Sequence, residues 1–137
     1  MQNNFWVIWL RFSAILTFFT GLVSSFASTE SGSYLWLFLF DLLTYPIDGN
    51  PSKFYSESFA LNAVLGGVMV GWSVLIYLLI EDDIQNNKKN LRFILISLIC
   101  WFIVDSVGSY FAGINGNIVL NIGFLFLYLP PLIKLLK

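Results

Sequence analysis

Histidine is absent from this sequence of 137 residues, and cysteine occurs once. Without imidazole, the chain has no means of building a histidine-ligated haem, a histidine zinc site or a catalytic triad whose base is histidine. The single cysteine, Cys100, excludes an internal disulfide, and its apolar surroundings favour a packing residue over a reactive thiol. We therefore expect no cofactor and no metal site.

Charged residues are also scarce. They make up 11% of the sequence, with 7 basic and 8 acidic residues and a formal net charge of -1. Because a nucleic-acid-binding surface needs a clustered basic face, we expect no nucleic acid partner. Apolar residues make up 58% of the chain, against about half in soluble domains. A domain this small has too little interior to bury them, so we expect its main partner to be the lipid bilayer.

Long apolar segments account for most of the chain. Four of them approach or exceed the ~20 residues needed to cross a bilayer, and they cover residues 5–26, 59–80, 91–112 and 118–136. The first segment is interrupted by Arg11 and has no basic residues before it, so we expect a retained helix and not a cleaved signal peptide. The pattern predicts an all-α protein, a single integral membrane four-helix bundle over residues 1–137.

A fifth apolar segment, residues 34–47, is shorter. Its 14 residues would extend about 21 Å as a helix, and Asp41 lies at its middle. Turn-rich sequence flanks it at residues 28–33 and 48–51. We expect a short interfacial or re-entrant helix between the first and second spans. A five-span alternative is disfavoured by this length.

The last two spans are predicted to be antiparallel neighbours. The segment between them, residues 113–117, contains Asn115-Gly116, a dipeptide typical of tight turns. Nearer the end of the chain, Pro130-Pro131 interrupts the fourth span and frees carbonyl groups one turn earlier, so we expect a kink there.

Basic residues are distributed unevenly about the four spans. If the N-terminus faces the cytoplasm, Lys53 alone lies on the outer side, and six basic residues face inward: Arg11, Lys88, Lys89, Arg92, Lys134 and Lys137. Lys and Arg favour the cytoplasmic side of membrane proteins. We therefore expect both termini to be cytoplasmic.

Asp105 is the one ionisable residue well inside a predicted span. A charge there costs at least ~2.5–3.5 kcal/mol unless it is paired or faces a wet cavity. Asn62, Asn121 and Ser109 are predicted to lie in the same outer layer, and Trp101 lies on the same helix face. Two interpretations remain open. These residues form a ligand, proton or cation site, or Asp105 is a hydrogen-bonding strut and Trp101 a packing residue.

Small and hydroxyl residues mark two further helix faces. In the second span, Ala63, Gly67 and Gly71 form an edge that lets helix backbones approach closely, within the bundle or between protomers. In the first span, a polar stripe is predicted to hydrogen-bond to neighbouring helices or to its own backbone carbonyls. Its members are Ser13, Thr17, Thr20 and Ser24.

Three stretches resemble small four-helix bacterial membrane proteins of the DoxX-like type. They are Gly-Gly-Val-Met-Val-Gly-Trp at 66–72, Trp-Phe-Ile-Val-Asp-Ser-Val-Gly-Ser at 101–109 and Asn-Ile-Val-Leu-Asn at 117–121. The resemblance covers roughly residues 59–124. It implies a location in the bacterial plasma membrane and, as for some members of that group, a role as a membrane subunit associated with quinone-linked oxidoreductases.

The sequence favours a non-catalytic role. Paired carboxylates, metal-ligand clusters and glycine-rich phosphate loops are missing, so we expect no catalytic residues. The leading hypothesis is a non-catalytic subunit or small-ligand-binding bundle, acting in a larger membrane complex or as a homo-oligomer. The alternative is a minimal oligomeric transporter or channel with Asp105 as its proton or cation site.

Overall fold

The described part of the chain folds entirely into helices. The computed structural model describes residues 2–43, 49, 55–80, 84 and 88–137, and within these residues it has no strand. The helices are α1 (Gln2–Phe26), α2 (Glu30–Leu43), α3 (Ser56–Leu79), α4 (Lys88–Phe111) and α5 (Asn115–Leu136). All except α2 are long and apolar enough to cross a membrane. The predictions of an all-α fold and of four long apolar helices are therefore confirmed.

Each long helix begins before its predicted first residue. α3, α4 and α5 start at Ser56, Lys88 and Asn115, three residues earlier than the apolar pattern indicates. The added turns are polar, with sequences such as Lys88-Lys89-Asn90. Hydropathy does not detect such turns, because a polar end turn forms the same backbone hydrogen bonds as an apolar one.

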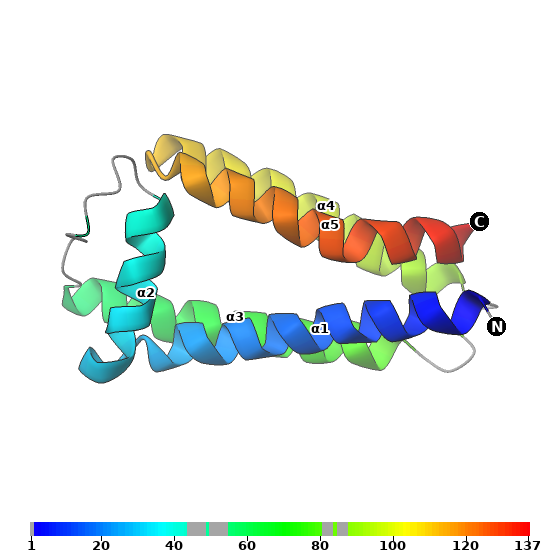
Figure 1. Ribbon diagram of the computed structural model, residues 1–137, viewed down its shortest axis with the longest axis horizontal. Coiled ribbons are helices and arrows are strands. Elements are labelled where there is room, and N and C mark those ends of the chain that lie inside the picture. The colour runs from blue at the N-terminus through cyan, green and yellow to red at the C-terminus, as the bar shows by residue number, and fades with distance from the viewer. Residues whose placement is uncertain (1, 44–48, 50–54, 81–83, 85–87) are drawn as a thin grey trace.

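The four long helices are arranged as two pairs. α1 packs along α3, α4 packs along α5, and contacts between α1 and α5 join the pairs, whereas α3 and α4 touch only sparsely. Figure 1 shows the pairs converging at the end where α1 begins and α5 ends, here called the terminal end. They diverge toward the opposite end, here called the α2 end.

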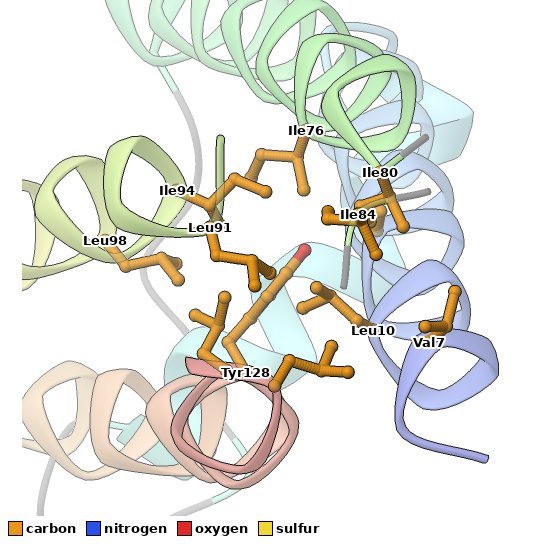
Figure 2. Packing of buried hydrophobic residues seen from close by; sticks show 12 residues of the cluster. Val7, Leu10, Ile76, Ile80, Ile84, Leu91, Ile94, Leu98 and Tyr128 are labelled. Atoms are coloured by element: carbon orange, nitrogen blue, oxygen red, sulfur yellow. The ribbon is translucent and has the colours of Figure 1, made fainter. Parts of the chain in front are cut away.

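The main hydrophobic core lies at the terminal end. It brings together side chains from α1, α3, α4 and α5, and Ile84 between α3 and α4 also contributes (Figure 2). Leu10, Leu91 and Tyr128 are among its fully buried members. Close packing of this cluster joins the two pairs at one end of the molecule.

Two glycines allow α1 and α3 to approach at the backbone. A Cβ atom placed on Gly66 would lie 2.6 Å from the carbonyl oxygen of Gly21 and 2.7 Å from the Cα atom of Ser25. A Cβ on Gly21 would lie 2.9 Å from the Cβ of Met69. Nearby, the hydroxyl of Ser24 donates a 3.4 Å hydrogen bond to the backbone carbonyl of Asn62. Any larger side chain at Gly21 or Gly66 would force the helices apart.

The short helix α2 begins four residues before its predicted start. Thr29 caps it, because the N–H of Gly32 donates a 3.1 Å hydrogen bond to the Thr29 hydroxyl. The helix therefore includes residues 30–33 of the turn-rich segment, and the predicted start at residue 34 was too late. The helix ends at Leu43, and residues 44–47 of the prediction lie outside the described residues. α2 runs across the α2 end between the diverging pairs (Figure 1).

The α4–α5 turn is built by Gly113 and not by Asn115-Gly116. Gly113 has φ +75°, a conformation that glycine adopts without strain. The N–H of Gly113 donates to the carbonyl of Tyr110 and the N–H of Ile114 to that of Ser109, the two bonds of a Schellman cap. The Asn-Gly turn prediction was wrong, because these residues open α5. The packing of α4 along α5 in this hairpin agrees with the predicted neighbours.

α5 continues as one helix through both prolines, and the expected kink stays a prediction. Pro131 has no N–H to donate to the carbonyl of Leu127 one turn earlier. The hydroxyl of Ser13 on α1 donates to that carbonyl instead, at 2.9 Å, and also lies 3.0 Å from the carbonyl of Trp9. A neighbouring helix thus supplies the donor that the proline removes.

Candidate functional site

Asp105 lies in a polar cluster at the α4–α5 turn. Its Oδ1 atom accepts hydrogen bonds from the side-chain amide of Asn117 at 2.8 Å and from the hydroxyl of Ser109 at 3.1 Å. The same amide also lies 2.8 Å from the Ser109 hydroxyl oxygen. Asp105 is half-buried and Ser109 is buried. The carboxylate therefore ties the last turns of α4 to the first turn of α5.

The local sequence explains this arrangement. Asp105 and Ser109 are four residues apart on α4, so both side chains lie on one face. The cap at Gly113 reverses the chain immediately afterwards and places the first turn of α5 against that face. Asn117 lies in this turn and reaches both residues.

Asn117 is the member of the cluster that sequence reasoning missed. It was predicted to lie in the loop, where a side chain has no defined partner. Its spacing of four residues from Asn121 was a usable signal, because residues four apart share a helix face. The spacing is informative only if residue 117 is helical, and the structure shows that α5 starts at Asn115.

Asn121 forms a separate layer. Its side-chain amide donates a 3.2 Å hydrogen bond to the hydroxyl of Ser106 on α4, and Asn121 itself is buried. The structure thus places Asn121 in the same helix hairpin as Asp105 but gives it a different partner. On α5 the two asparagines lie about one turn apart, whereas their partners Asp105 and Ser106 are consecutive residues of α4.

Asn62 lies in the other helix pair. It is on α3, 7% exposed, and its backbone carbonyl accepts the bond from Ser24 on α1. At this level α3 has diverged from α4, as Figure 1 shows. Of the predicted site residues, the structure therefore brings Ser109 to Asp105 and leaves Asn62 with α1.

Trp101 packs among aromatic rings. Its ring centroid lies 5.7 Å from that of Trp72 on α3 and 5.9 Å from that of Phe124 on α5, the latter in an edge-on arrangement. Such geometry is typical of stabilising aromatic contacts. The three rings come from α3, α4 and α5, which agrees with the packing interpretation of Trp101.

The edge of Ala63, Gly67 and Gly71 faces outward. All three residues are exposed, and a Cβ atom added to Gly67 or Gly71 would meet nothing within 4 Å. Close packing inside the bundle is provided by Gly66. Of the two alternatives for the edge, the structure therefore does not support packing within the bundle, and packing between protomers stays a prediction. The hydrophobic pattern of α3 does not distinguish adjacent glycines, because it does not reveal how the helix is rotated.

The polar stripe of α1 connects it to both neighbouring helices, as predicted. Thr17 and Tyr128 lie with their hydroxyl oxygens 2.6 Å apart, and both hydroxyls are also within hydrogen-bond distance of the Ser13 carbonyl. Thr20 bonds to the carbonyl of Leu16 in its own helix. Sequence reasoning missed Tyr128, because a tyrosine in an apolar run gives no indication of its partner.

Side-chain donors meet helix carbonyls at the terminal end. Arg11 Nη2 donates to the carbonyl of Ile80 at 3.0 Å, and Lys88 Nζ donates to that of Leu136 at 3.0 Å. The cations therefore lie at the C-terminal ends of α3 and α5, where the helix dipole favours positive charge.

No family model, curated protein or solved structure matches the chain. The resemblance to DoxX-like proteins therefore stays a prediction.

The Asp105 cluster has limited chemistry. One carboxylate beside an amide and a hydroxyl is able to accept hydrogen bonds, hold a cation or exchange a proton. In the described ranges, no three His, Cys, Asp or Glu residues are grouped closely enough to hold a metal ion. The strongest geometric feature of the cluster is that it fastens α4 to α5.

Proposed function

We propose that this protein is an integral membrane four-helix bundle that acts as a non-catalytic subunit of a membrane assembly or as a small-ligand-binding bundle. The observation that supports this most is that polar side chains inside the bundle form hydrogen bonds to one another. Asp105 is bonded within the α4–α5 hairpin, and Thr17 and Tyr128 are bonded between α1 and α5. Side chains engaged in this way hold helices together in lipid.

The surface of α4 is the proposed face for a partner subunit. Only 17% of the apolar stretch of α4 is buried inside the bundle, whereas 39% of the apolar stretch of α1 is buried. Its exposed residues include Val104 and Phe111, at 73% and 82%. An apolar surface of this extent suits a second membrane polypeptide.

The proposed orientation places the terminal end in the cytoplasm of a bacterial cell, because the basic residues near that end favour it. α2 is then an interfacial helix on the outer side. Its 14 residues run across the long helices, and its exposed residues include Tyr34 and Phe38. A cysteine replacing Lys88 should resist labelling by an impermeant reagent added to intact cells. Labelling from outside would reverse the orientation.

Purification from membranes with a mild detergent tests the subunit proposal. A second polypeptide should co-purify with the wild-type protein in a fixed ratio, and Val104→Trp on α4 should reduce the amount that co-purifies. Val119→Trp on α5 is the matched control, because Val119 is similarly exposed at 70%. Recovery of the folded chain without a polypeptide or ligand would contradict the proposal.

A second candidate is a minimal oligomeric transporter or channel that uses Asp105 as its proton or cation site. The observation that favours it is the partial exposure of Asp105, which gives the carboxylate access to its surroundings. Net proton or cation flux in proteoliposomes separates this candidate from the first. Flux that Asp105→Asn abolishes would favour the transporter.

A further inference from the structure

A shallow groove runs between α1 and α3 on the surface of the bundle. It measures about 210 Å³, and its exposed lining is apolar. The lining includes Ala14, Ile15, Phe18, Val74, Tyr77 and Leu78. Ile15 and Val74 are 41% and 42% exposed, so the groove opens outward. The small Ala14 is 1% exposed and leaves space between these larger neighbours.

A positive charge lies at the terminal end of this groove. Arg11 precedes Ala14 and Ile15 by three and four residues, so it lies on the same face of α1. Its guanidinium carbon is 6.0 Å from the ring centroid of Tyr77, a residue of the groove lining. Its bond to the carbonyl of Ile80 holds the charge at the end of α3.

The dimensions match one leaflet of a bilayer. Arg11 and Phe18 are separated by seven residues of α1, or about 10 Å along the helix. Half of the hydrocarbon core of a bilayer is about 15 Å thick. With Arg11 at headgroup depth, the groove therefore lies within the depth of one leaflet, where it contacts part of an acyl chain.

From these features we propose that the groove binds one anionic phospholipid. An acyl chain lies along the apolar lining between α1 and α3, and the headgroup phosphate lies beside Arg11. The guanidinium group suits this role because its planar donors match phosphate oxygens and its charge favours a headgroup of net negative charge. This inference rests on the proposed membrane location and adds a ligand class and a site to it.

Native mass spectrometry of the full chain in detergent tests the site, with phosphatidylglycerol and phosphatidylcholine added in equal amounts. The wild-type protein should retain one phosphatidylglycerol in preference to phosphatidylcholine. Val74→Trp fills the groove and should strip the bound lipid, whereas Val68→Trp should retain it. Val68 is on the same helix, 62% exposed and not among the groove residues. If Val74→Trp does not fold, Ile15→Trp replaces it in this test, because it blocks the groove from α1.

Arg11→Gln tests the headgroup separately. It should reduce the preference for phosphatidylglycerol about fivefold, the effect of one cation near an anionic lipid surface, while an acyl chain still binds. The proposed lipid site would be overturned if the wild type retained both lipids equally. It would also be overturned if folded Val74→Trp and Val68→Trp retained equal amounts of lipid. Either result would leave the membrane proposal unchanged. Recovery of the wild-type chain in the soluble fraction of cells would instead refute the membrane proposal.

Discussion

Thr17 on α1 and Tyr128 on α5 share a hydrogen bond 2.6 Å long in the fully buried part of the bundle. Each hydroxyl also lies within 3.0 Å of the carbonyl oxygen of Ser13. One hydroxyl hydrogen therefore links the two side chains, and the other goes to that carbonyl. Both donors are satisfied without water, which suits a dry layer between helices.

Tyr128→Phe should destabilise the bundle by removing this link. Measured intramembrane hydrogen bonds average about 0.6 kcal/mol and reach about 1.7 kcal/mol, and we expect a loss in this range. Unfolding in detergent mixtures measures it, with the exposed Tyr110→Phe as control. In a double-mutant cycle, Thr17→Val should couple to Tyr128→Phe. Additive losses would show that the two hydroxyls act independently.

The hydroxyl of Ser13 should stabilise the bundle because Pro131 has no N–H for the carbonyl of Leu127. Ser13→Ala leaves the Leu127 carbonyl without its 2.9 Å donor, and an unsatisfied buried group costs about 1–3 kcal/mol. In a Pro131→Ala background, residue 131 regains an N–H for that carbonyl, so Ser13→Ala should cost much less. The four proteins of this cycle are compared by free energy of unfolding. The same cost in both backgrounds would contradict the proposed role of Ser13.

The adjacent glycines Gly66 and Gly67 form a matched pair. Gly66→Ala places a methyl group against the backbone of Gly21 and Ser25, and such overpacking costs about 1–3 kcal/mol. Gly67→Ala meets nothing within 4 Å, so its stability should equal or exceed that of the wild type. Thermal unfolding of both variants tests this difference. Equal stability of the two would mean that α3 is rotated from the orientation described above.

Gly67→Leu tests self-association through the outward edge of Ala63, Gly67 and Gly71. If a second copy packs there, a bulky side chain keeps the backbones apart and should shift the detergent-solubilised species to a smaller mass. Light scattering measures that mass, and Val119→Leu on α5 is the control. An unchanged mass with an intact fold would remove this edge from consideration as a protomer interface.

Asp105→Asn separates a strut from a proton or cation site. An amide oxygen still accepts the bonds from Asn117 and Ser109, so stability should change by only about 1 kcal/mol. Asp105→Leu removes the acceptor and should be more damaging. If Asp105 acts as a strut, the Asn variant keeps its partner or ligand. A folded Asn variant that has lost ion flux would instead support the transporter.

The sequence by itself determined which segments become long apolar helices, because hydropathy and length depend on the local chain alone. It also placed Asp105 and Ser109 together, since residues four apart on one helix are neighbours in any fold. The hydroxyl stripe of α1 was readable for the same reason. Each of these features follows from helix geometry within a single segment.

Only the tertiary structure decided which partner each side chain meets. How the helices pair and rotate decides that α1 packs against Gly66 and not Gly67. It also decides that Asp105 is bonded by Asn117 and not Asn62, and that Thr17 is bonded to Tyr128. In an apolar helix every face is compatible with lipid, so the hydrophobic pattern does not reveal the rotation. The interhelical contacts resolve it, because only certain rotations allow close backbone approach and satisfy the buried polar groups.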